Sequence, residues 1–133
     1  MGPEGADASL TDALTLKFGS VVVVFFTRRI SMMTKFLTLE LAIEFYHLVK
    51  NYKFHNRVMQ DQFNRALLSI PLNLSEGSGK PTHKDRRKFY FTSYASLREI
   101  EVLFRLQGEE KYKDQINRLA AYIWKVAQRT GGA

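Results

Sequence analysis

Residues 56–85 read NRVMQDQFNRALLSIPLNLSEGSGKPTHKD, which combines a helix pattern, a glycine-rich linker and the start of another helix. Apolar side chains recur at three- and four-residue spacing in the first part: Met59, Phe63, Ala66, Leu67, Ile70 and Leu74. This spacing puts them on one face of a helix, which we predict over about residues 56–76. Gly77 ends the helix pattern, and residues 77–81 (GSGKP) form the linker.

Pro71 interrupts the apolar pattern of this helix. Its nitrogen cannot donate a hydrogen bond to Leu67, and its ring disfavours helical angles at Ile70. The helix therefore either kinks at Pro71 or ends and restarts with Pro71 in a new first turn. Because Leu74 keeps the apolar phase of Leu67 and Ile70, we predict a kinked helix.

Three more helix patterns surround this one, over about residues 36–51, 82–107 and 109–128. Thr82 and Asp85 fit a variant of the capping box at the start of the third helix. Glu109 and Glu110 suit the positive N-terminal end of the fourth. Short connections between four such helices predict an all-α protein, an antiparallel up-down-up-down four-helix bundle within residues 35–133. Surplus apolar surface on the first and third helices indicates burial against another subunit.

Residues 1–34 are predicted to be a poorly structured N-terminal extension outside the core. Residues 21–26 (VVVVFF) are β-branched and aromatic, so they favour a strand if ordered. This run is far shorter than the roughly 20 residues that span a bilayer, and no membrane association is expected. Arg28 and Arg29 follow the run instead of preceding it, unlike a secretory signal. We expect the functional protein to begin at Met32 or Met33.

Composition narrows the functional classes. The chain has 133 residues, 45% hydrophobic and 25% charged, as in a folded domain. It has no cysteine, which excludes disulfides and thiolate chemistry and suits a cytoplasmic location. The net charge is +7, and it lies entirely in residues 35–133 because the charges of residues 1–34 cancel. A basic domain of this kind attracts polyanions such as RNA and DNA.

Residues 69–80 (SIPLNLSEGSGK) resemble the signature of a four-helix-bundle family found in intervening sequences of bacterial 23S ribosomal RNA. The similarity continues through residues 89–91 (FYF) and 96–101 (SLREIE) and spans roughly residues 36–128. The family's first helix usually contains a tryptophan, whereas Phe45 and Tyr46 stand in that region here. The resemblance implies a ring-like homo-oligomer, commonly a pentamer. It also implies relatives that are basic accessory proteins of diversity-generating retroelements, associated with nucleic acid and reverse transcriptase.

The basic stretch at residues 80–88 (KPTHKDRRK) is the strongest candidate site. Positive charge in the first turns of a helix opposes the macrodipole, and an anionic partner would offset that cost. We predict that its cations bind the phosphates of structured RNA or DNA, with His83 contributing at lower pH. The predicted nucleic-acid-binding residues are Lys80, Lys84, Arg86, Arg87 and Lys88. The alternative is a solvated basic face that only aids solubility.

Polar residues set among core positions form the second group of candidates: Asn73, Glu76, Ser96 and Glu99. We interpret them as a structural hydrogen-bond network that fixes register. A catalytic carboxylate pair is the alternative, but Glu99 and Glu101 are two residues apart and cannot face each other on a helix. Tyr52, Phe54 and His55 are expected to pack at the first turn instead of stacking on bases.

No enzyme, metal or cofactor signature emerges from these patterns. Glu44 and His47 have the spacing of a di-iron motif, but that site needs a second copy, which the sequence lacks. The sequence therefore predicts a non-enzymatic, homo-oligomeric bundle that binds nucleic acid. The alternative is a structural adaptor that holds a protein partner such as a nucleic-acid enzyme.

Overall fold

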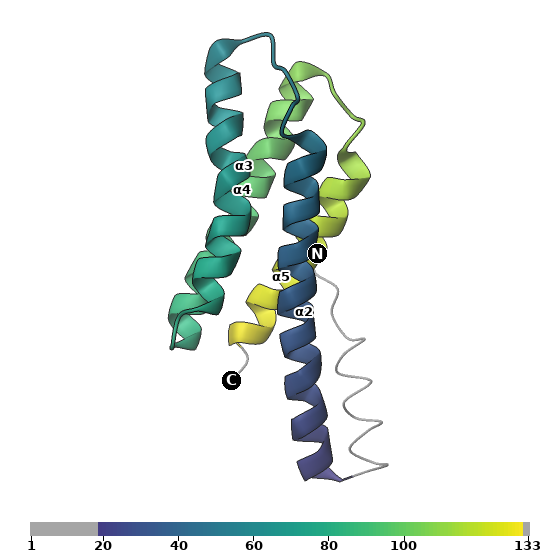
Figure 1. The fold of residues 1–133 in the computed structure, drawn as a ribbon, viewed down its shortest axis with the longest axis vertical. Helices are drawn as coiled ribbons and strands as arrows, with labels where there is room; N and C mark the ends of the chain where they lie inside the picture. Colours follow the sequence, from purple (N-terminus) through teal and green to yellow (C-terminus); the bar gives the residue numbers. More distant parts are fainter. Residues whose placement is uncertain (1–18, 132–133) are drawn as a thin grey trace.

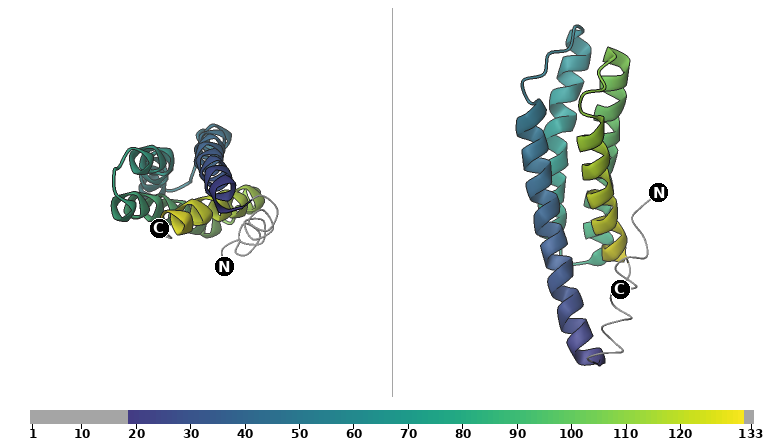
Figure 2. Two further views of the ribbon diagram at one scale, coloured as in Figure 1. Left: turned by 90° about the horizontal axis from the view of Figure 1, so that it is seen from below. Right: turned by 90° about the vertical axis from the view of Figure 1, so that its right-hand side faces the viewer.

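The computed structural model describes residues 19–131, which form four α-helices and no strand (Figure 1). The helices are α2 (Ser20–Val49), α3 (Arg57–Ser78), α4 (His83–Gln107) and α5 (Lys113–Gly131). Consecutive helices run in alternate directions, and α5 closes the bundle by packing against both α4 and α2 (Figures 1 and 2). The predicted all-α four-helix bundle is confirmed.

Helix α2 begins at Ser20, well before the predicted start near residue 36. The strand predicted for residues 21–26 is wrong, since these residues are helical. The helix continues across residue 34 without a break, and the Arg129 guanidinium donates a 2.7 Å hydrogen bond to the Thr34 hydroxyl. Extending an existing helix by one residue costs less free energy than nucleating a new helix. This advantage outweighs the strand preference of the valines. Residues 1–18 of the predicted extension lie outside the described residues.

Helix α3 runs without interruption through Pro71, so it does not restart there, and the kink stays a prediction. Side chains donate to the backbone beside the proline. The Asn73 amide donates to the Ser69 carbonyl at 2.8 Å, and the Ser93 hydroxyl of α4 donates to the Ile70 carbonyl at 2.9 Å. Ser93 is fully buried, and its hydroxyl links α3 to α4 in the core. This hydrogen bond lies next to Pro71, which has no backbone amide hydrogen to donate.

The two ends of α4 differ from each other in how well they match the prediction: its start is as predicted, but its end uses residues that were predicted to begin the next helix. The Thr82 hydroxyl accepts from the Asp85 amide at 3.2 Å, which confirms the predicted cap. At the other end Gly108 has a φ of 80°, a conformation that favours glycine, and the Glu109 amide donates to the Phe104 carbonyl. Glu109 thus closes α4 instead of starting α5, which begins at Lys113.

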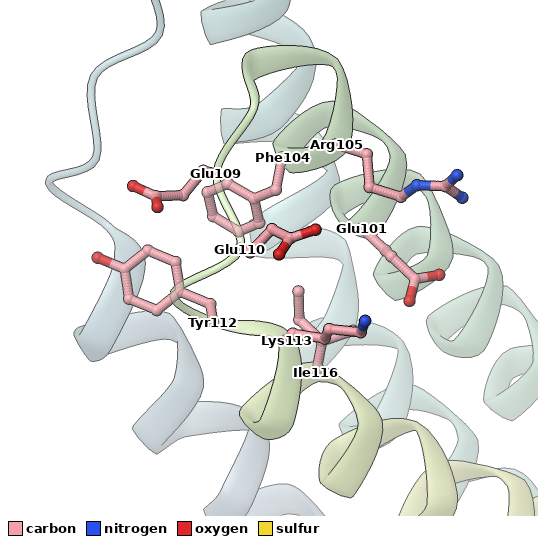
Figure 3. Close-up of a pocket in the computed structure, with 8 residues that line it drawn as sticks. All are labelled: Glu101, Phe104, Arg105, Glu109, Glu110, Tyr112, Lys113 and Ile116. Atoms are coloured by element: carbon pink, nitrogen blue, oxygen red, sulfur yellow. The ribbon is translucent and has the colours of Figure 1, made fainter.

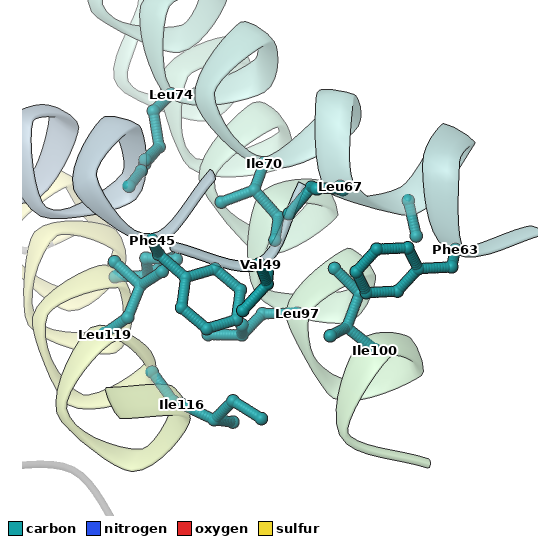
Figure 4. Packing of buried hydrophobic residues seen from close by; sticks show 14 of the residues in the cluster. Phe45, Val49, Phe63, Leu67, Ile70, Leu74, Leu97, Ile100, Ile116 and Leu119 are labelled. Atoms are coloured by element: carbon teal, nitrogen blue, oxygen red, sulfur yellow. The ribbon is translucent and has the colours of Figure 1, made fainter. Parts of the chain in front are cut away.

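The core is formed by apolar side chains from all four helices (Figure 4). At the end of the bundle near the α2–α3 turn it becomes a cluster of aromatic rings: Tyr52, Phe54, Phe63, Phe104 and Tyr112. The Phe104 ring centroid lies 5.0 Å from that of Tyr52 and 5.2 Å from that of Tyr112. The predicted packing at this turn is confirmed for Tyr52 and Phe54, whereas His55 is exposed.

Gly77→Ala is expected to destabilise the bundle by about 1–2 kcal/mol, although alanine favours a helix over glycine. A methyl group at this position would lie 2.8 Å from Cε1 of Tyr90, whose ring is buried, and 3.1 Å from Cβ of Phe89. Gly79→Ala is the matched control, because its nearest atom would be the Glu76 carbonyl oxygen at 3.6 Å. Chemical denaturation measures both, and a Gly77→Ala variant as stable as the Gly79→Ala variant would contradict the close approach.

Candidate nucleic-acid interface

The five predicted cations all lie at the α3–α4 end of the bundle, but the structure divides them into two groups. The Arg86 side chain turns back toward the linker, where its Nε donates to the Lys80 carbonyl at 2.6 Å and its Nη2 to the Pro81 carbonyl at 3.1 Å. The Lys80 ammonium pairs with Glu76 at 3.2 Å and lies 5.1 Å from the Phe89 ring centroid. The side chains of Arg86 and Lys80 therefore stabilise the linker between α3 and α4.

Lys84, Arg87 and Lys88 form the second group, on the outer side of α4. Together with His83 and Phe91 they line an open groove of about 460 Å³, which we call the α4 groove. All three cations are exposed, and in the described part of the chain none of them pairs with a carboxylate. Three unneutralised cations on adjacent turns of one helix make a surface suited to an anion.

Aromatic rings extend the α4 groove along the α4–α5 contact. The Phe91 and Trp124 ring centroids are 5.7 Å apart, and those of Tyr94 and Trp124 are 5.4 Å apart. An arginine lies over each of the two α4 rings in these contacts. The Arg87 guanidinium is 5.3 Å from the Phe91 centroid, and the Arg98 guanidinium is 5.0 Å from the Tyr94 centroid. The result is a continuous series of cations and half-buried rings.

Two polar groups occur within this series of rings: the charged guanidinium of Arg98 and the indole nitrogen of Trp124. Arg98 donates two hydrogen bonds to the Tyr94 hydroxyl and one to Glu101. Burial lowers the pKa of Arg98, but these partners outweigh it and raise the pKa, so the guanidinium stays charged. The Trp124 Nε1 is buried without a hydrogen-bond partner among the described residues. Sequence reasoning missed the series because Phe91 and Tyr94 have core spacing and Trp124 lies on another helix.

Lys35 of α2 is a further cation that the sequence did not indicate. Its pKa is lowered, first by partial burial and then by the nearby positive charge of Arg86. Helix α2 thus adds a positive charge at the linker end, and only the tertiary fold brings Lys35 and Arg86 near each other.

The four residues of the predicted polar network each form a hydrogen bond or an ion pair. The Asn73 amide and the Ser96 hydroxyl both bond to the Ser69 hydroxyl at 2.8 Å, which joins α3 to α4. Glu76 instead pairs with Lys80, and Glu99 accepts a 2.9 Å hydrogen bond from the Gln62 amide. Ser96 and Glu99 thus each form a hydrogen bond between α3 and α4, and Ser69 and Ser93, which the sequence did not indicate, complete these interhelical contacts.

A second concavity of about 290 Å³ lies between the end of α4 and the start of α5 (Figure 3). It mixes carboxylates with bases around two rings: Glu101, Glu109, Glu110, Arg105, Lys113, Phe104 and Tyr112. Across residues 19–131 no three acidic or histidine side chains gather closely enough to hold a metal ion, and Glu44 and His47 do not belong to such a group. None of the described helices is long and apolar enough to cross a membrane.

The fold and the surface of α4 together define a small helical-bundle protein with a cationic face beside one interhelical linker. The chain belongs to the 23S rRNA-intervening sequence protein family, whose model matches residues 36–129. The match begins within α2, includes all of α3 and α4, and confirms the family resemblance carried by the residues around Pro71. Comparisons with curated proteins and with solved structures gave no match.

Proposed function

We propose that this chain is a cytoplasmic, non-enzymatic, homo-oligomeric accessory protein that binds RNA or DNA through backbone phosphates. The observation that supports binding is the α4 groove, in which Lys84, Arg87 and Lys88 stay exposed and unpaired within the described residues. Lysine and arginine contacts to phosphates release counterions and give affinity that does not depend on sequence. Lys35, Lys80 and Arg86 add positive charge nearby.

The exposed apolar surface of helix α2 is the observation that supports the proposed oligomer. Its apolar residues are spread almost evenly around the helix, and a helix of this kind is normally buried on all sides. Yet one face of α2 exposes a series of large apolar side chains: Met32, Met33, Phe36, Leu37 and Ile43. A second copy would cover this face, and we propose that the copies form a ring-like homo-oligomer such as a pentamer. A ring would repeat the α4 groove and so multiply its avidity.

Met33→Glu combined with Phe36→Glu is expected to convert the oligomer to a monomer, because buried charges at a subunit contact would be unpaired. Both positions are more than 60% exposed in the single chain (62% and 64%), so the helix content should not change. Light scattering after size exclusion measures the mass, and circular dichroism checks the fold. Val58→Glu, at an exposed position of α3, is the control. An unchanged mass would contradict an interface on this face.

Fluorescence anisotropy of the full chain tests nucleic-acid binding. The probes are a ribosomal RNA stem-loop and a matched DNA duplex, each titrated across a salt series. We expect micromolar or tighter binding at physiological salt and a steep slope of log affinity against log salt. The ratio of the two affinities identifies the preferred backbone. No binding of either probe would contradict the proposal.

A structural adaptor for a protein partner is the second candidate. A groove of about 220 Å³ between α2 and α5 supports it. Its apolar lining consists of the exposed Leu48, the partly exposed Leu41 and the buried Phe45 and Leu119. Such a groove can hold apolar anchors of a partner such as a nucleic-acid enzyme. A pull-down that returns one stoichiometric protein after nuclease treatment would favour this function.

A further inference from the structure

We propose that the α4 groove binds an unpaired nucleotide, with its phosphate on Lys84 and Lys88 and its base stacked beside Arg87 and Phe91. This inference rests on the proposed nucleic-acid binding and specifies its substrate, a single-stranded segment of RNA or DNA.

Lys84 and Lys88 supply the phosphate contacts. They lie one helical turn apart on the same side of α4, where their flexible ammonium groups can converge on one phosphate or on two in succession. Neither is paired with a carboxylate in the described part of the chain, so no ion pair among these residues would have to break for a phosphate to bind. His83 borders the same groove and adds a donor.

Arg87 and Phe91 supply the stacking surface. The planar guanidinium lies over the ring at 5.3 Å from its centroid, and both groups line the groove. Aromatic rings and guanidinium planes are the surfaces on which proteins stack unpaired bases. A base inside a duplex is already stacked on both faces, so it cannot reach Phe91. The groove volume, about 460 Å³, lies in the range of small-ligand sites.

The rings beyond Phe91 continue the same surface. Two arginine–ring pairs, Arg87 with Phe91 and Arg98 with Tyr94, flank Trp124 of α5. Phe91, Tyr94 and Trp124 are partly exposed, unlike the fully buried rings of Phe63 and Phe104. A series of partly exposed rings along a positive groove suits single-strand binding.

The test compares two probes on the full chain, a 5′-phosphorylated 12-nucleotide oligouridylate and a blunt RNA duplex of the same length. Phe91→Leu keeps an apolar side chain but removes the ring. We expect it to weaken single-strand binding on the order of tenfold and to leave duplex binding unchanged. Trp124 is the only tryptophan of the chain, so its fluorescence should change with the single strand and not with the duplex.

Two further variants make each outcome decisive. Phe89→Leu makes the same substitution on α4 beside Lys80, outside the groove, and should leave single-strand binding unchanged. Arg87→Lys keeps the charge of an exposed residue but loses the planar stack, so it should weaken single-strand binding even if Phe91→Leu fails to fold. Equal effects on both probes, or none on the single strand, would overturn stacking while phosphate binding stands. No binding of either probe by the unsubstituted chain would instead overturn the proposed function.

Discussion

Replacing Arg87 and Lys88 with alanine is expected to weaken binding to nucleic acid of every sequence and to flatten its dependence on salt. Each phosphate contact contributes about 1 to the slope of log affinity against log salt, so the slope should fall by about 2. Both side chains are exposed and unpaired with carboxylates in the described residues, so the melting temperature should not change. Anisotropy titrations at four or more salt concentrations measure the slope.

Lys50→Ala with Lys53→Ala is the matched control for this variant. It removes the same charge at the α2–α3 connection, at the opposite end of the bundle from the α4 groove (Figure 1). If binding is confined to the α4 groove, the control variant should keep nearly the full affinity for nucleic acid. Equal losses in the two double variants would show that net charge, and not the α4 groove, attracts the nucleic acid.

Phe104→Ala is expected to lower the free energy of unfolding by about 3–5 kcal/mol, the usual cost of removing a core phenylalanine. Phe104 is 2% exposed, and its ring contacts four others in the aromatic cluster: Tyr52, Phe54, Phe63 and Tyr112. Its loss would leave a cavity where the ends of α2, α3 and α4 meet the α4–α5 connection. Urea unfolding at a fixed protein concentration measures the change, since oligomerisation also affects stability.

Leu106→Ala provides the comparison, two residues further along the same helix. Leu106 is 71% exposed, so its truncation should change the free energy of unfolding by no more than about 0.5 kcal/mol. A cost for Phe104→Ala below about 1 kcal/mol would mean that the aromatic cluster rearranges easily around the missing ring. A large cost for Leu106→Ala would instead place that side chain in a subunit contact.

The sequence predicted α3 and α4 well because their boundaries depend on local chemistry. Asn56 caps α3 with its side-chain oxygen, and Thr82 caps α4 with its own hydroxyl. The start of α2 was missed because residues 21–26 favour a strand locally, whereas the contact of Thr34 with Arg129 is tertiary. The start of α5 was missed because acidic residues also suit a connection that closes the preceding helix.

The candidate site was predicted by its charges but not by its geometry. The sequence indicated Lys84, Arg87 and Lys88 as phosphate-binding residues by their charge, and these three line the groove. The turn of Arg86 toward the carbonyls of the linker depends on the path of the chain after Gly79, which spacing does not give. The approach of Trp124 to Phe91 likewise depends on how α5 packs against α4.

The uninterrupted course of α2 has a consequence for attaching probes to this protein. Because a helix rises about 1.5 Å per residue, residues 20–34 extend for roughly 20 Å, and the helix projects beyond its neighbours (Figure 2). Its first residue and the last residue of α5 lie at the same end of the bundle as the α3–α4 linker (Figure 1). A fluorophore or immobilisation tag that must stay clear of the α4 groove therefore belongs at the opposite end, on the α2–α3 or α4–α5 turn.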